Sequence, residues 1–109
     1  MGLGREEEVE IQGQPLFMPG VKVKSIRYVK NDGTYAGREV GEVLVRKGDV
    51  GYVRDIGTFL QRYYIYAVEF IETGVLVGMR GRELAALDAN GEMILRPKVR
   101  HIREEFEPQ

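Results

Sequence analysis

The chain has 109 residues, of which 43% are hydrophobic, and this size and composition suit one small domain. It contains no cysteine, which excludes disulfides and any thiolate-held metal or iron–sulfur cluster. Its single histidine, His101, lies among charged residues and cannot form a histidine metal site alone. Nothing in the sequence suggests a Ser-His-Asp or Cys-His arrangement either, so we predict a protein that is not an enzyme and carries no cofactor or metal.

The sequence also limits where the protein works. No apolar run approaches the roughly 20 residues that cross a bilayer, and the acidic start of the chain lacks the apolar core of a signal peptide. We therefore expect a cytoplasmic protein without membrane contact. The formal net charge is −1, and the mild positive excess over residues 20–62 falls short of a nucleic-acid footprint, so no nucleic-acid partner is expected.

The first part of the chain combines a leader with a strand. Residues 1–20 are polar, contain Gly and Pro and show no sustained period, which predicts a flexible leader. Within it, residues 16–18 supply a short apolar anchor able to dock at the domain edge. Residues 21–29 alternate apolar and charged side chains and change parity near Ser25, which predicts a strand with a bulge there.

The middle of the chain alternates strands with turns. Residues 43–45 and 51–56 predict short strands on either side of an RKGD turn in which Gly48 takes a positive φ. The segment GTFLQR, residues 57–62, predicts a second loop. The run YYIYAVEFI, residues 63–71, is rich in aromatic and β-branched residues and apolar on both faces, which predicts a long central strand.

Turn residues divide the remainder into short elements. Residues 72–74 predict a hairpin turn that leads into a strand over 75–79. The segment RGRELAAL, residues 80–87, is too short and too closely flanked by glycine for a full helix and predicts a single helical turn. A last short strand is expected over 92–95. Residues 97–109 are expected to form a charged tail.

These elements predict an all-β fold: a small SH3-like barrel of about five short strands with one helical turn, spanning residues 21–96. The order of elements favours this architecture, because a turn-rich segment, a long strand, a hairpin and a helical turn precede the last short strand. An OB-type barrel is the alternative, although it commonly inserts a longer helix.

Two loops carry the candidate functional residues. The segment NDGTY is typical of an Asx-type turn, in which Asn31 and Asp32 cap backbone N–H groups. The alternative is a recognition loop that projects Thr34 and Tyr35 toward a partner. Asp32 and Asp55 together offer too few oxygen ligands to predict a calcium site, which needs about six.

The second loop contains Phe59 and Leu60 in a connection that is normally polar. Such residues either fold back over an open end of the barrel or form an exposed contact patch with a polar rim from Gln61. We single out this loop as the best candidate for function. Tyr64 and Tyr66 share a face of the following strand, where packing within the sheet is a better interpretation than stacking on nucleobases.

The segments NDGTYAG, LVRKGDVGYVRDIGTFLQ, IYAVEF and VGMR stand in the order and spacing of the NifZ family, which the chain resembles over residues 21–84. The resemblance implies a non-catalytic, chaperone-like accessory protein of nitrogen fixation. Its partner would be the immature molybdenum–iron protein of nitrogenase, whose P-cluster it would help to mature. The family pattern and the two loops together give a predicted partner-binding set: Asn31, Asp32, Thr34, Tyr35, Asp55, Thr58, Phe59, Leu60, Gln61 and Arg80.

Two positions depart from the family pattern, which commonly has Pro where Ala36 stands and Cys where Met79 stands. The second departure argues against direct cluster handling by this chain. Two other classes of function stay open. An SH3- or KOW-like RNA-binding module would gather its positive residues on one face and bind with a steep salt dependence. A structural subunit of a larger enzyme would purify in a stable stoichiometric complex.

Overall fold

Strands make up almost all of the regular structure in the computed structural model, which describes residues 11 and 13–95. The predicted all-β class is therefore confirmed, and the predicted helical turn is present as a 3₁₀ turn, η2 (Gly81–Glu83). The strands are β1 (Lys22–Ser25), β2 (Val29–Lys30), β3 (Val43–Val45), β4 (Val50–Phe59), β5 (Tyr63–Phe70), β6 (Leu76–Met79), β7 (Leu84–Leu87) and β8 (Met93–Leu95).

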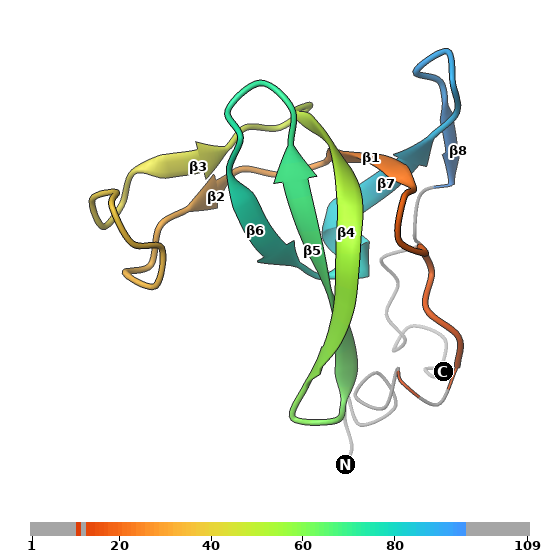
Figure 1. Ribbon diagram of the computed structural model, residues 1–109, viewed down its shortest axis with the longest axis horizontal. Helices are drawn as coiled ribbons and strands as arrows, with labels where there is room; N and C mark the ends of the chain where they lie inside the picture. Colours follow the sequence, from red (N-terminus) through yellow and green to blue (C-terminus); the bar gives the residue numbers. More distant parts are fainter. Residues whose placement is uncertain (1–10, 12, 96–109) are drawn as a thin grey trace, which may run out of the picture.

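Six strands form one antiparallel sheet in the order β6-β5-β4-β1-β7-β8, and β2 pairs with β3 in a separate ribbon (Figure 1). Among the described residues no pairing joins the outer strands β6 and β8, so the sheet is open and is not closed into the predicted barrel. In place of the expected five or so strands, the described residues form eight strands in two sheets. The physical reason is that the chain leaves the main sheet after β1, so β2 and β3 bond to each other and do not help to close it.

A sharp bend at Ser25 separates β1 from β2. The buried Ser25 hydroxyl donates to the Arg27 carbonyl oxygen at 2.6 Å and accepts from the Arg27 N–H at 3.2 Å. These local bonds compete with ladder bonds and turn the chain within two residues. The single bulged strand predicted over residues 21–29 is therefore wrong: the parity change at Ser25 marks a break.

The core lies against β5 and includes a residue from before the first strand. Phe17 is almost fully buried, and its ring meets that of Tyr66 edge to face at a centroid distance of 5.2 Å. The neighbouring Leu16 N–H donates to the Tyr66 hydroxyl at 2.8 Å. Docking of the predicted 16–18 anchor is thus confirmed through Phe17. Residues 1–10 and 12 of the predicted leader, and the whole predicted tail, lie outside the described residues.

Several local predictions hold. β5 is an interior strand, between β4 and the edge strand β6, and the last strand is present at β8. Gly48 and Gly74 adopt φ values of 96° and 74°, as their turns require. Among the residues described, no helix has the length and apolar character needed to span a bilayer.

Two segments predicted as a loop and a helical turn contain strands. β4 continues to Phe59 because each of residues 57–59 pairs with β5, which shortens the predicted 57–62 loop to a turn at 60–62. β7 follows η2 directly and is buried along its whole length while pairing with β1. Its four apolar residues lack the alternation of a half-exposed strand, so periodicity alone could not separate strand from helix.

Candidate functional site

The outer half of the β4–β5 hairpin is a two-stranded ribbon that projects beyond the rest of the sheet (Figure 1). Within β4, only residues 50–52 pair with β1. Within β5, only residues 66–69 pair with β6. Residues 57–59 therefore pair with 63–65 and with no third strand among the described residues. A ribbon of this kind is marginal by itself in water. Here the segment before β1 supports it, since the Tyr64 hydroxyl donates to the Gly13 carbonyl oxygen at 2.7 Å.

The turn at the end of this ribbon is strained. Leu60 and Gln61 both adopt left-handed backbone angles, with φ of 52° and 56°. The Arg62 N–H donates to the Phe59 carbonyl oxygen at 2.9 Å and closes the turn. Left-handed angles cost non-glycine residues roughly 1–2 kcal/mol each, and hairpin turns of this kind normally use Asn and Gly. The sequence thus places two side chains at a position where glycine would be more stable.

A stack of three side chains lies beside the turn. The rings of Phe59 and Tyr63 stack with a centroid distance of 5.4 Å, and the Arg80 guanidinium carbon lies 3.6 Å from the centre of the Tyr63 ring. Phe59 is 48% exposed and Leu60 is 72% exposed, so the apolar residues of this turn do not fold back onto the core. We call Phe59, Leu60, Gln61, Tyr63 and Arg80 the hairpin tip. Its exposure agrees with the second of the two alternatives for this loop and not with folding back over the end of the sheet.

Arg80 is held in this position by the 3₁₀ turn that follows it. The backbone N–H of Arg80 donates to the Glu83 Oε1 at 2.9 Å, while the Glu83 Oε2 forms an ion pair with the Arg27 guanidinium at 3.2 Å. The Glu83 carboxylate is thus occupied, and within the described residues no carboxylate pairs with the Arg80 guanidinium. The guanidinium therefore keeps its N–H donors for solvent or for a partner.

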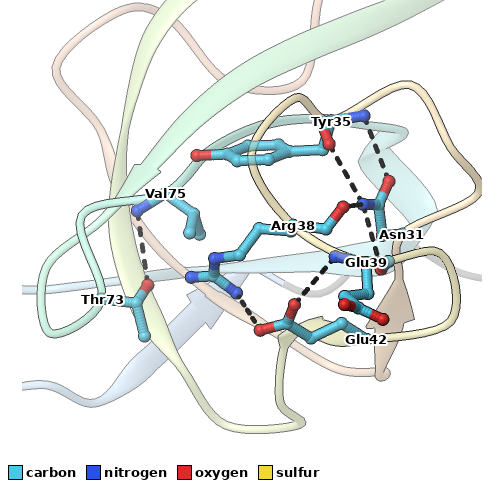
Figure 2. A network of polar contacts seen from close by, with 7 residues as sticks. All are labelled: Asn31, Tyr35, Arg38, Glu39, Glu42, Thr73 and Val75. Carbon is cyan, nitrogen blue, oxygen red and sulfur yellow. Dashed lines mark hydrogen bonds and ion pairs between the residues drawn. The ribbon is translucent and has the colours of Figure 1, made fainter.

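The other candidate loop, which contains NDGTY, spans residues 31–42 between β2 and β3 and is organised around a buried amide (Figure 2). Asn31 is 2% exposed, and its Nδ2 donates to the carbonyl oxygens of Tyr35, Arg38 and Glu39 at 3.0–3.2 Å. Its Oδ1 accepts from the N–H groups of Gly33 and Tyr35. The Asx-turn interpretation is therefore correct for Asn31, and this side chain cannot touch a partner without unfolding the loop.

The other predicted residues of the 31–42 loop divide between the core and the surface. Tyr35 is half-buried and packs against the hydrophobic core. Asp32 is exposed, and its Oδ1 accepts from the Thr34 hydroxyl at 2.7 Å and from the Thr34 N–H at 3.1 Å. These hydrogen bonds, the one from the hydroxyl first, hold the pKa of Asp32 below its ordinary value of 3.8.

The structure does not bring the two predicted loops together. The 31–42 loop lies beyond β2 and β3, whereas the hairpin tip lies at the far end of the β4–β5 ribbon (Figure 1). Thr58 is exposed on that ribbon opposite Tyr64, and Asp55 is exposed beside the register shift of β4. Of the predicted set, only Phe59, Leu60, Gln61 and Arg80 meet at one place, through Tyr63. Sequence reasoning missed Tyr63, although a tight turn after Phe59 would have placed the two rings opposite each other.

The described residues offer little that resembles a reaction site. They contain no group of three or more His, Asp or Glu side chains placed to hold a metal ion. Three hollows lined by described residues measure about 210, 270 and 290 Å³. These volumes lie below the roughly 300–1,000 Å³ that is typical of sites for small ligands. The exposed hairpin tip is therefore the leading candidate for function.

Comparison with known proteins identifies the family. The NifZ domain model matches residues 14–86. The chain belongs to the NifZ family. It is 66% identical over 87 residues to a NifZ protein of Sinorhizobium fredii, a match covering 80% of this chain and 81% of the relative. It is 57% identical over 74 residues to a NifZ protein of Rhodobacter capsulatus, a match covering 68% of this chain and 95% of the relative.

The NifZ proteins of two Azotobacter species are longer. The match to the protein of Azotobacter vinelandii is 47% identical over 75 residues and covers 69% of this chain but 47% of the relative. Membership of the NifZ family gives the protein a role in nitrogen fixation. No solved structure matches this NifZ chain.

Proposed function

We propose that this NifZ protein is a non-catalytic, chaperone-like factor of the cytoplasm that binds the immature molybdenum–iron protein of nitrogenase and assists maturation of its P-cluster. The observation that carries the proposal is the exposed hairpin tip. A projecting ribbon ends there in apolar side chains, beside an arginine that has no carboxylate partner among the described residues. The exposure of Phe59 and Leu60, unlike the contact of Arg80 with Tyr63, has no evident use in stabilising the free protein.

The hairpin tip has the composition of a binding hot spot. Hot spots concentrate aromatic residues and arginine around a desolvated centre. Burial of Phe59 and Leu60 in a pocket of the client would contribute about 1.5–3 kcal/mol for each side chain that becomes fully buried. The stacking of Phe59 on Tyr63 and of Tyr63 under Arg80 restricts these side chains before binding, which lowers the entropy lost on association.

The amino-acid composition of the chain indicates which part of cluster maturation it could perform and which part the client would perform. Without cysteine it has no thiolate to offer an iron–sulfur cluster. The ligands and the cluster chemistry are therefore assigned to the client, and this protein is assigned the task of holding an apoprotein surface in a receptive conformation. Contact alone is sufficient for that role, because binding to one conformation of the client shifts its population.

The test is replacement of both exposed residues, Phe59→Ser with Leu60→Ser. Tagged protein is used to capture the molybdenum–iron protein purified from cells that lack this NifZ protein. We expect binding to fall at least about tenfold, which corresponds to about 1.4 kcal/mol. Undiminished capture would overturn the proposal.

The matched control is a second adjacent pair of exposed apolar residues on another edge of the sheet. Met93 and Ile94 of β8 are 44% and 63% exposed, close to the values at the tip. We expect the Met93→Ser, Ile94→Ser variant to bind like the wild type. An equal loss in both variants would indicate a general effect of surface hydrophobicity, which would contradict a specific role for the tip.

A further inference from the structure

A groove of about 270 Å³ lies between β6 and the 31–42 loop. Residues 76–78 line one side, and Asp32, Thr34 and Tyr35 lie on the other. The groove therefore lies between the sequence segments NDGTY and VGMR, which are more than 40 residues apart in the chain. Of these two segments, only Arg80 belongs to the hairpin tip. Both walls are formed by parts of the molecule to which the proposed function gives no task.

The backbone of β6 faces this groove with unpaired groups. Among the described strands β6 pairs only with β5, and the Phe70 N–H donates to the Val75 carbonyl oxygen at 2.9 Å. Hydrogen-bonded positions alternate along an antiparallel pair. The register therefore directs the N–H and C=O groups of Val77 toward β5 and those of Leu76 and Gly78 toward the open edge. Within the described chain, these outward groups have no hydrogen-bond partner.

The edge of β6 is short, at four residues, but it lacks the other usual protections against another strand. Natural edge strands are kept very short or are blocked by Lys, Pro, a bulge or a covering segment. β6 has the sequence LVGM, pairs with β5 without a register shift, and leaves Leu76 exposed. An edge of this kind is a template for strand addition, in which main-chain hydrogen bonds supply affinity.

The opposite wall is rigid enough to keep the groove open. The hydrogen bonds of Asn31 hold the loop that carries Asp32 and Thr34. The ring of Tyr35 reaches from this loop toward Val75 and packs against the core (Figure 2). The lining carries one cation, Lys30, and one anion, Asp32, so the groove has no net preference for a charged ligand.

We propose that the outer edge of β6 receives an extended segment of the client polypeptide as an added strand. The inference rests on the proposed function, since it assigns a second contact to the same client. The segment hydrogen-bonds to the backbone of Leu76 and Gly78, and its side chains lie along the groove against Tyr35. The hairpin tip and the β6 edge then contact the client at two separate places on the molecule.

The decisive variants differ only at Leu76. Leu76→Pro removes the outward N–H and places a ring in the groove, whereas the β5 ladder keeps its bonds because this N–H does not take part in it. Leu76→Thr also loses the leucine side chain but keeps the N–H. We expect Leu76→Pro to bind the client about tenfold more weakly than Leu76→Thr, the effect of one lost main-chain hydrogen bond. Equal binding would overturn the strand addition.

Hydrogen exchange on the wild type keeps the inference testable if Leu76→Pro does not fold. In the free protein the amides of Leu76 and Gly78 should exchange fast and that of Val77 slowly. In the complex with the molybdenum–iron protein from cells lacking this NifZ protein, the first two should become protected. Binding without such protection would overturn this inference alone, whereas no binding by the wild type would overturn the proposed function as well. Protection in the isolated protein, with the mass of a dimer, would assign the edge to a second copy and contradict a client strand.

Discussion

The hairpin tip and the 31–42 loop are both connections between adjacent antiparallel strands, yet their sequences serve opposite purposes. In the loop, the polar side chain of Asn31 turns inward and satisfies five backbone groups. At the tip, apolar side chains turn outward on a turn with two left-handed residues that are not glycine. The hydrogen bonds of Asn31 stabilise the loop, whereas the left-handed angles of the tip cost stability in the free protein.

This comparison shows which family positions maintain the fold and which are available to a partner. Asn31 is unavailable to any partner because the loop surrounds it. It nevertheless belongs to the same NDGTY motif as the exposed Asp32 and Thr34. Phe59 and Leu60 are available because nothing in the described part of the molecule covers them. A shared motif therefore combines structural and contact residues, and burial separates the two.

The largest effect is expected at Asn31. Asn31→Ala removes the side-chain partner of the Tyr35 and Arg38 carbonyl oxygens and of the Gly33 and Tyr35 N–H groups, whereas the Glu39 carbonyl oxygen keeps its hydrogen bond from the Glu42 N–H. Because unsatisfied buried groups cost about 1–3 kcal/mol each and the loop can relax toward solvent, we expect a loss of about 3 kcal/mol in the free energy of unfolding. Urea denaturation measures it. Asn31→Asp should be no better, since a carboxylate cannot donate to the three carbonyls, and a stable Asp variant would contradict this account.

An opposite change is expected at the tip. Replacing Leu60 by Asn and Gln61 by Gly supplies the residues that left-handed turn positions prefer, and we expect the free energy of unfolding to rise by about 1 kcal/mol. The control is Gln61→Ala, which keeps the unfavourable angle and should give no gain. Client binding, measured on the same proteins, should fall with the loss of Leu60. A variant that is both more stable and equally tight in binding would show that the strain has no role in recognition.

The sequence was sufficient to predict elements that depend on local chemistry. The turn glycines, the Asx turn at Asn31 and the central β5 follow from residue type and periodicity. The full length of β4 did not, because Gly57 and Thr58 are typical of loops and a turn without glycine at Leu60 and Gln61 has no local signature. Their conformation is imposed by the pairing of the flanking strands.

The candidate site was predicted in part for the same reason. An apolar pair in a loop identified Phe59 and Leu60, since that signal is local. The stack on Tyr63 depends on the register between β4 and β5, and the approach of Arg80 depends on the path of the chain through η2. Neither relation has a fixed sequence spacing. The open sheet was missed because nothing in the residues around Ser25 showed that β2 and β3 would pair apart from the main sheet.

A smaller effect on stability is expected at Arg80. Arg80→Gln removes the cation over the Tyr63 ring, an interaction worth about 0.5–1 kcal/mol at a partly exposed site. Arg80→Lys keeps the charge but loses the planar stack. Its free energy of unfolding, measured by urea denaturation, should therefore lie between those of the wild type and of Arg80→Gln. If the guanidinium also meets a carboxylate of the client, binding by the wild type should weaken with added salt, and binding by Arg80→Gln should weaken less. Identical salt dependence would show that Arg80 serves only to hold Tyr63.

The smallest effect is expected at the exposed end of the 31–42 loop. Thr34→Ala removes the hydroxyl that donates to Asp32, so the pKa of Asp32 should rise toward 3.8, as followed by the carboxyl resonance in an NMR titration. A carboxyl whose pKa is lower in the folded state stabilises the protein above its unfolded pKa, and this contribution is lost as the pH falls through the folded pKa. The wild type should therefore lose a small stability increment below pH 3.8 that Thr34→Ala largely lacks. A titration of Asp32 unchanged by the substitution would mean that the Thr34 backbone N–H, which the variant keeps, holds the carboxylate by itself.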